Sequence, residues 1–348
     1  MTGIEWTDRT WNPVTGCTPV SEGCDHCYAQ TFAERWRGVP GHPYQGGFDL
    51  TLRPGRLLDP LRWRTPAKVF TSMTDLFHDG VPDAYLARVF AVMGLATRHT
   101  FQVLTKRHAR ARALLTQPGF HHQVAEQASD IIGRGIRIRL DLTGWTPLPG
   151  TRPTVWSPPW PLPNVWLGVS AEDQHWASIR IPALLATPAA VRFVSAEPLL
   201  GPLELGDWVR PVPGCRYANP DDGCCAHPRA ATPECFRGAD CPVSPDAYHG
   251  LDWLIVGGES GPGARPLDLA WVQQLVDYAE AEVLPVYVKQ LGAVWARTHG
   301  GPVKGGDPGR WPPQLRVRQF PTGRFPTGRG DRGRALPHIP TRTGAAPA

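Results

Sequence analysis

The stretches VWLGVSAE (165–172) and VRFVSAE (191–197) share one pattern, in which a short apolar run is followed at once by a serine and a glutamate. Runs this short and apolar are typical of strands that are buried on both faces. Ser170 and Glu172 then follow the first strand, and Ser195 and Glu197 follow the second. This arrangement, repeated along the chain, decides the fold.

Four further apolar runs end in the same way, at 69–72, 101–104, 254–256 and 286–288. The polar groups that follow them are Thr74 with Asp75, Lys106 with Arg107, Glu259 with Ser260, and Lys289 with Gln290. Helical patterns at 27–37, at 82–97 and after a capping Asp268 lie between strands, so the strands are expected to be parallel with right-handed crossovers. We predict an α/β fold, a partial or complete parallel (β/α) barrel of the TIM type.

The polar groups at the strand ends meet on one rim of such a barrel, where active sites are found. Strands that simply end in solvent also carry polar residues. However, charged groups beside buried strands are costly unless they meet a ligand or each other, so the set as a whole favours a site.

Composition, charge and cysteine count limit which partners and which chemistry that site can have. The 348 residues are 41% hydrophobic and carry a net charge of +5, which permits a nucleic-acid partner without requiring one. Without a signal peptide or a long apolar run, we expect a cytoplasmic protein with no membrane segment. The eight cysteines then indicate metal or redox chemistry rather than disulfides.

The expected organisation is one barrel domain at 1–321, with two loop insertions, and a disordered basic Gly/Pro/Arg tail at 322–348. The first insertion, about 118–163, is rich in Pro and Trp and is either a lid or an irregular surface loop. The second, about 209–250, is rich in cysteine. Its four candidate zinc ligands are Cys225, His227, Cys235 and Cys241. Their spacing is not a paired CxxC, so an irregular loop with unligated cysteines stays open.

The stretch TGCTPVSEGCDHCYA (15–29) carries Cys17, Cys24 and Cys27 just before the first predicted helix, and therefore on the active rim. Three thiolates leave a tetrahedral metal site one ligand short. Zinc would take a histidine, such as His26 or His42, or a water as the fourth ligand. A [4Fe-4S] cluster would keep one iron open for a cofactor.

A three-cysteine loop after the first strand of a parallel barrel resembles the radical S-adenosylmethionine enzymes. Their usual first spacing has three residues, whereas this chain has six. More closely, the chain resembles an uncharacterised, phage-associated three-cysteine-motif family. The segments that carry this resemblance are IEWTDRTWNPVTGCTPVSEGCDHCYA, SMTDLFHDGVPDAYL, FQVLTKR, NVWLGVSAEDQ, VRFVSAEPLLGPL, DWLIVGGESGPGARP, YVKQLG and RVRQFP.

The resemblance implies a radical-SAM-type barrel that binds a [4Fe-4S] cluster through Cys17, Cys24 and Cys27. S-adenosylmethionine would bind the open iron, and its cleavage would start radical chemistry on a nucleic acid or nucleotide. Under this interpretation Ser72, Asp75, Ser170 and Glu259 bind the cofactor, and Lys106, Glu197 and Lys289 act in catalysis. A separate three-Cys-motif protein is an implied partner.

Two alternatives stay open at this point. In one, the three cysteines hold a structural zinc, and the protein is a nucleic-acid or protein-binding module without catalysis. In the other, the protein is a metal-free barrel hydrolase that uses its rim carboxylates.

Overall fold

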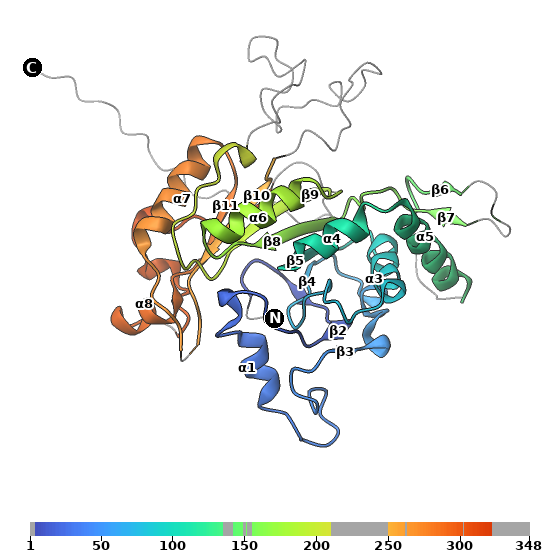
Figure 1. Cartoon of the computed structure of the whole chain (residues 1–348), viewed down its shortest axis with the longest axis horizontal. Helices are drawn as coiled ribbons and strands as arrows, with labels where there is room; N and C mark the ends of the chain where they lie inside the picture. Colours follow the sequence, from blue (N-terminus) through green and yellow to red (C-terminus); the bar gives the residue numbers. More distant parts are fainter. Residues whose placement is uncertain are drawn as a thin grey trace, which may run out of the picture.

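The fold is built on one curled sheet of seven parallel strands, shown in the computed structural model in Figure 1. The structure describes residues 4–134, 142–148, 151, 155–209, 250–261, 263–301 and 303–321. The strands lie side by side in chain order. They are β1 (Arg9–Thr10), β4 (Lys68–Phe70), β5 (Thr100–Thr105), β8 (Val165–Ser170), β9 (Val191–Ala196), β10 (Trp253–Gly257) and β11 (Val286–Gln290). Because β1 and β11 form the two edges of this sheet, the fold is a half-barrel, and the predicted partial barrel is confirmed.

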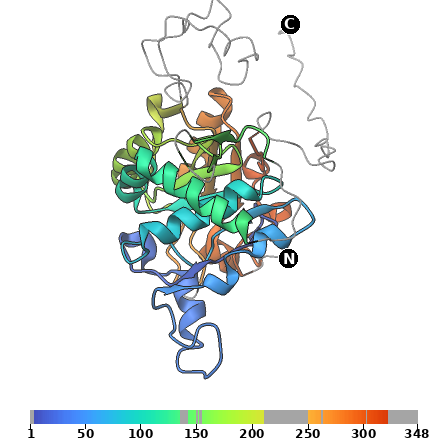
Figure 2. The same cartoon turned by 90° about the vertical axis from the view of Figure 1, so that its right-hand side faces the viewer.

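Helices connect the strands along the chain (Figure 2). They are α1 (Tyr28–Glu34), α2 (Asp59–Arg62), α3 (Asp83–Leu95), α4 (His108–Leu115), α5 (Pro118–Gly133), α6 (Gln174–Leu185), α7 (Leu269–Ala281) and α8 (Gly292–Thr298). The expected cap is present, since the Asp268 carboxylate accepts a 2.8 Å hydrogen bond from the Ala270 amide. Two small antiparallel pairs complete the fold, β2 (Val14–Thr15) with β3 (Thr51–Leu52) and β6 (Thr146–Pro147) with β7 (Trp156–Ser157).

Aromatic side chains fill the concave face of the sheet. They form a cluster that contains Trp6, Phe70, Trp166, Phe193, Trp253 and Tyr287. The Trp6 ring lies 4.6 Å from Phe70 and 6.0 Å from Trp253, edge to face in both cases. A Cβ at Gly168 would lie 2.4 Å from the Phe193 ring, so the packing requires a glycine there. The aromatic cluster closes the interior below the carboxyl ends of the strands.

The segment RVRQFP (316–321) fastens the far edge of the sheet. The Val288 amide donates to the Val317 carbonyl, and the Gln319 amide donates to the Val286 carbonyl, each over 2.9 Å. Phe320 then packs 5.3 Å from both Trp253 and Tyr287, with the Lys68 ammonium 4.8 Å from its ring centroid. Because Lys68 belongs to β4, this segment links strands from both halves of the sheet.

The first insertion differs from the expected irregular segment. Its first sixteen residues form α5, which packs on α3 and on the β6–β7 hairpin. Phe120, Val124, Ala128 and Ile131 are buried at helical spacing, and this apolar stripe explains why the segment folds as a helix. Most of the second insertion, 210–249, and the tail from 322 lie outside the described residues. None of the described helices is both long enough and apolar enough to span a membrane.

Candidate functional site

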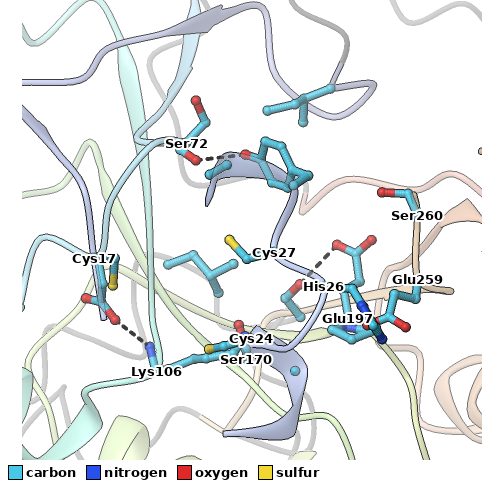
Figure 3. A pocket seen from close by; sticks show the side chains of 18 of the residues that line it. Cys17, Cys24, His26, Cys27, Ser72, Lys106, Ser170, Glu197, Glu259 and Ser260 are labelled. Carbon is cyan, nitrogen blue, oxygen red and sulfur yellow. Dashed lines mark hydrogen bonds between the residues drawn. The ribbon is translucent and has the colours of Figure 1, made fainter. Parts of the chain in front are cut away.

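A cavity of about 250 Å³ lies at the carboxyl ends of the strands. Ten of the side chains predicted from the sequence line it together: Cys17, Cys24, Cys27, Ser72, Asp75, Lys106, Ser170, Glu197, Glu259 and Lys289. All of them except Asp75 and Lys289 are labelled in Figure 3. The predicted zinc ligands Cys225, His227, Cys235 and Cys241 lie outside the described residues. Over the described ranges, no group of three or more His, Cys, Asp or Glu side chains is arranged to hold a metal ion.

Strand periodicity places the polar residues above the aromatic cluster. Side chains on one face of a strand recur every second residue. Leu104 and Lys106 therefore lie on the same face of the sheet, as do Tyr287 and Lys289. Leu104 packs against the aromatic cluster and Tyr287 belongs to it, and Lys106 and Lys289 line the cavity. The polar rim continues the inner face of the sheet.

The cysteine loop follows β1 and runs beside the loop after β4. The Gly16 amide donates to the Met73 carbonyl over 2.9 Å, and the Thr74 hydroxyl donates to the Gly16 carbonyl over 2.9 Å. Gly16 has a φ of +90°, and a Cβ there would lie 2.3 Å from the Asp49 carbonyl oxygen, so this turn requires glycine. The turn directs the next residue, Cys17, into the cavity.

The other two cysteines lie at the next turn of the chain. Cys24 ends a short 3₁₀ helix, Glu22–Cys24, and Cys27 is the N-cap residue of α1. All three thiols are partly exposed. Burial raises the pKa of the Cys17 thiol, and the negative charge of Asp75 adds to this shift.

Glu172 anchors the cysteine loop from one side. Its carboxylate accepts a 2.7 Å hydrogen bond from the Ser21 hydroxyl and pairs with Arg180 at 2.7 Å and Lys106 at 3.2 Å. A Cβ at Gly23 would lie 2.3 Å from the same carboxylate, so the loop approaches Glu172 closely. Burial alone would raise the pKa of Glu172, but Lys106 and Arg180 hold it below its ordinary value.

Arg265 clamps the same loop from the other side. Its guanidinium pairs with Glu259 at 2.7 Å and with Asp25 at 3.2 Å, and it donates to the Glu22 carbonyl over 2.7 Å. Burial would raise the pKa of Glu259, but hydrogen bonds from the side chain and the amide of Arg265 lower it. A planar five-donor guanidinium suits this bridging of several acceptors.

The Asp75 carboxylate is fully engaged by the protein. It accepts hydrogen bonds from the Thr105 hydroxyl at 2.7 Å, the Lys106 amide at 2.9 Å and the Phe77 amide at 3.0 Å. These contacts tie the loop after β4 to the end of β5. They favour a positioning role for Asp75 within the cavity wall.

Glu197 and Lys289 leave more capacity for a ligand. Their charged atoms lie 3.1 Å apart, and the Ser195 hydroxyl donates to the other Glu197 oxygen over 3.1 Å. Three buried polar atoms of other residues that line the cavity have no hydrogen-bond partner among the described residues: Trp6 Nε1, Thr71 Oγ1 and Gln290 Oε1. Buried polar groups are normally satisfied, so a polar ligand fits this cavity.

The family model described as "Protein of unknown function (DUF5131)" matches residues 1–336. The chain belongs to this family. No curated protein and no solved structure matches it.

Two organising residues of this DUF5131 protein escaped prediction. Arg180 lies in α6, eight residues after Glu172, and resembles an ordinary surface cation in the sequence. Arg265 follows the glycine-rich segment GGESGPG, six residues after Glu259. For Arg265, the only available signal was a lone arginine close to a rim carboxylate.

Proposed function

We propose that this protein is a radical-SAM-like iron–sulfur enzyme that binds a [4Fe-4S] cluster through Cys17, Cys24 and Cys27. The observation that carries the proposal is the convergence of these three thiols on one cavity at the carboxyl end of a parallel half-barrel. The five remaining cysteines lie at 215–241, outside the described residues.

Three thiols can serve a single ion or a cluster. Zinc bonds every thiolate at about 2.3 Å and takes a fourth ligand. A four-iron cluster bonds each of three thiolates at a different iron. With three protein ligands, one iron remains for S-adenosylmethionine.

The cavity walls offer partners for both charged groups of S-adenosylmethionine. The cofactor, bound to the cluster, would supply a carbon radical after one-electron reduction. Glu197 can accept from its amino group, and Lys289 can donate to its carboxylate, through the pair that already faces the cavity. Lys106 and Glu259 add charge to the wall, while Glu172 and Arg265 hold the cysteine loop in place.

The substrate in this proposal is a nucleic acid or nucleotide. It rests on the resemblance to the phage-associated family and on the basic composition of the tail at 322–348. The same resemblance supports a three-Cys-motif protein as a partner.

Metal analysis after anaerobic purification and reconstitution tests the proposal. We expect iron and acid-labile sulfide in the wild type and in Cys235→Ala, and loss of both in Cys24→Ala. After reduction, the wild type should release methionine from S-adenosylmethionine. Stoichiometric zinc without iron would instead assign the three thiols to a zinc site, and a cluster without cofactor cleavage would remove the radical mechanism.

A further inference from the structure

Helix α1 buries small residues and exposes large aromatic ones, which is the reverse of an ordinary amphipathic helix. Its buried residues are the small Ala29 and Ala33. Its large aromatic residues face solvent, with Tyr28 48% and Phe32 43% exposed, and Trp36, in the turn that follows, is 36% exposed. Exposed large apolar residues that gather on one surface mark an interaction site.

Each of these three rings is held in place by a neighbour. The Tyr28 hydroxyl donates to the Ser72 carbonyl over 2.8 Å. Phe32 packs edge to face on Tyr44 with the centroids 5.6 Å apart, and Trp36 stacks on His42 at 4.0 Å. Rings that are both exposed and fixed lose little side-chain entropy when a flat partner stacks on them.

The aromatic surface leads into the cavity. Tyr28 follows Cys27 directly and lines the cavity with it. Figures 1 and 2 both show α1 and the chain after it projecting from the half-barrel. We call the exposed residues Tyr28, Phe32 and Trp36 the aromatic platform. A polymer lying along it would therefore reach the three thiols.

The surroundings of the platform are basic. Residues 28–59 contain four arginines against one glutamate and two aspartates. Arg37 pairs with Glu34 and Asp49, and Arg56 pairs with Asp59. Arg35 has no carboxylate partner among the described residues, and Lys304 adds a further cation at the cavity wall.

We propose that the aromatic platform binds single-stranded nucleic acid, with successive bases stacked on its rings and the next nucleotide directed into the cavity. Bases stack on exposed aromatic side chains regardless of sequence, while arginines beside them follow the phosphates. This inference narrows the substrate of the proposed radical enzyme to a single-stranded nucleic acid. It rests on that function for the reaction but not for the binding.

Fluorescence anisotropy of the purified full chain with labelled single-stranded DNA and RNA tests the platform. Trp36→Ala and Phe32→Ala should each weaken binding about five- to a hundredfold, as expected for the loss of one base–aromatic stack. The matched control is Trp156→Ala, because Trp156 in β7 is similarly exposed at 42%. This variant should bind as the wild type does. The DNA and RNA arms show which polymer is preferred, and a duplex of equal charge should bind more weakly than either.

Salt dependence tests the basic surroundings separately. Arg35→Ala should reduce the magnitude of the slope of log affinity against log salt by about one, the value expected for the loss of one phosphate contact. Trp36→Ala should leave this slope unchanged. Equal loss of affinity in Trp36→Ala and Trp156→Ala would overturn the proposal, as would equal binding of duplex and single strands. Dimerisation that Trp36→Ala abolishes, without nucleic-acid binding, would assign the platform to a second copy and also overturn it.

The experiments can reject either of the two proposals without rejecting the other. Single-strand binding that depends on Trp36, in a protein that holds no cluster, would keep the platform and reject the radical enzyme. Cofactor cleavage in a protein whose affinity for single strands is unaffected by Trp36→Ala and Phe32→Ala would do the reverse.

Discussion

The neighbouring strands β8 and β9 end in the same tripeptide, Ser-Ala-Glu, yet the two glutamates have different surroundings. Ser170 lies opposite Ser195 in the sheet, so the tripeptides are also in register. The Glu172 side chain is fully buried between Arg180, Lys106 and Ser21. The Glu197 side chain is 12% exposed and faces the cavity with Lys289.

Glu172 and Glu197 differ in burial and in partners because different segments of the chain lie over their carboxylates. The cysteine loop and α6 close over Glu172, and they bring Ser21 and Arg180 with them. Beside Glu197 lies Gly257, where a Cβ would be 2.4 Å from the carboxylate oxygen. A side chain at that position would crowd Glu197, so glycine preserves its place at the cavity wall. The shared tripeptide sets the position of each glutamate, and distant segments set its role.

The largest expected effect is the loss of folding stability in Glu172→Gln. This change leaves the buried Arg180 without its carboxylate, although two of the three guanidinium nitrogens of Arg180 already lack hydrogen-bond partners among the described residues. Breaking a buried pair in this way costs about 3–5 kcal/mol of unfolding free energy. Urea unfolding measures it. Glu197→Gln is the matched control and should lose about 1 kcal/mol of unfolding free energy, because its partner Lys289 is partly exposed. Equal losses in the two variants would contradict the difference assigned to the two glutamates.

In ligand binding the order of the two glutamates should be reversed, with the larger effect at Glu197. Glu197→Gln should weaken S-adenosylmethionine binding to the reconstituted protein about ten- to a hundredfold, because a charge-assisted hydrogen bond is worth about 1.5–3 kcal/mol. Isothermal titration calorimetry measures this affinity. Val283→Ala, at an exposed position away from the cavity, serves as the control. Unchanged affinity in Glu197→Gln would deny Glu197 a part in the cofactor site.

A smaller effect is expected from Arg265→Lys. Lysine keeps the charge but cannot bridge Glu259, Asp25 and the Glu22 carbonyl at once. We expect about 1 kcal/mol of destabilisation and faster hydrogen exchange at amides 22–25. Arg316→Lys changes an arginine away from the cysteine loop and should leave that exchange unaltered. Protection that survives Arg265→Lys would show that Glu172 alone holds the loop.

The last prediction concerns how the stability difference between wild type and Glu172→Gln depends on pH. Because the folded pKa of Glu172 is lowered, its stabilisation is present above its unfolded pKa of about 4.3 and is lost as pH falls through the folded value. The stability gap between wild type and Glu172→Gln should therefore stay constant above about pH 5 and narrow below it. Urea midpoints across pH 3–7 measure the gap, and a gap that widens in acid would contradict the assigned charge.

The sequence predicted the fold and the composition of the cavity because both depend on local pattern. Each apolar run became a strand, and Lys106, Glu197 and Lys289 reached the cavity by continuing the inward face of those strands. The helical stripe of α5 was also local but lay within a segment dominated by Pro and Trp. The anchoring roles of Glu172 and Arg265 depend on contacts between distant segments, which no local pattern reveals.

The cysteine loop is secured by partners that the chain supplies late. Ser21 bonds Glu172, 151 residues further along, and Asp25 pairs with Arg265, 240 residues further along. At about 5–20 residues per second of translation, the three thiols leave the ribosome many seconds before either anchor does. The spacing of the three thiols is therefore set only after both anchors have been synthesised. If the thiols hold the proposed cluster, its assembly would follow folding.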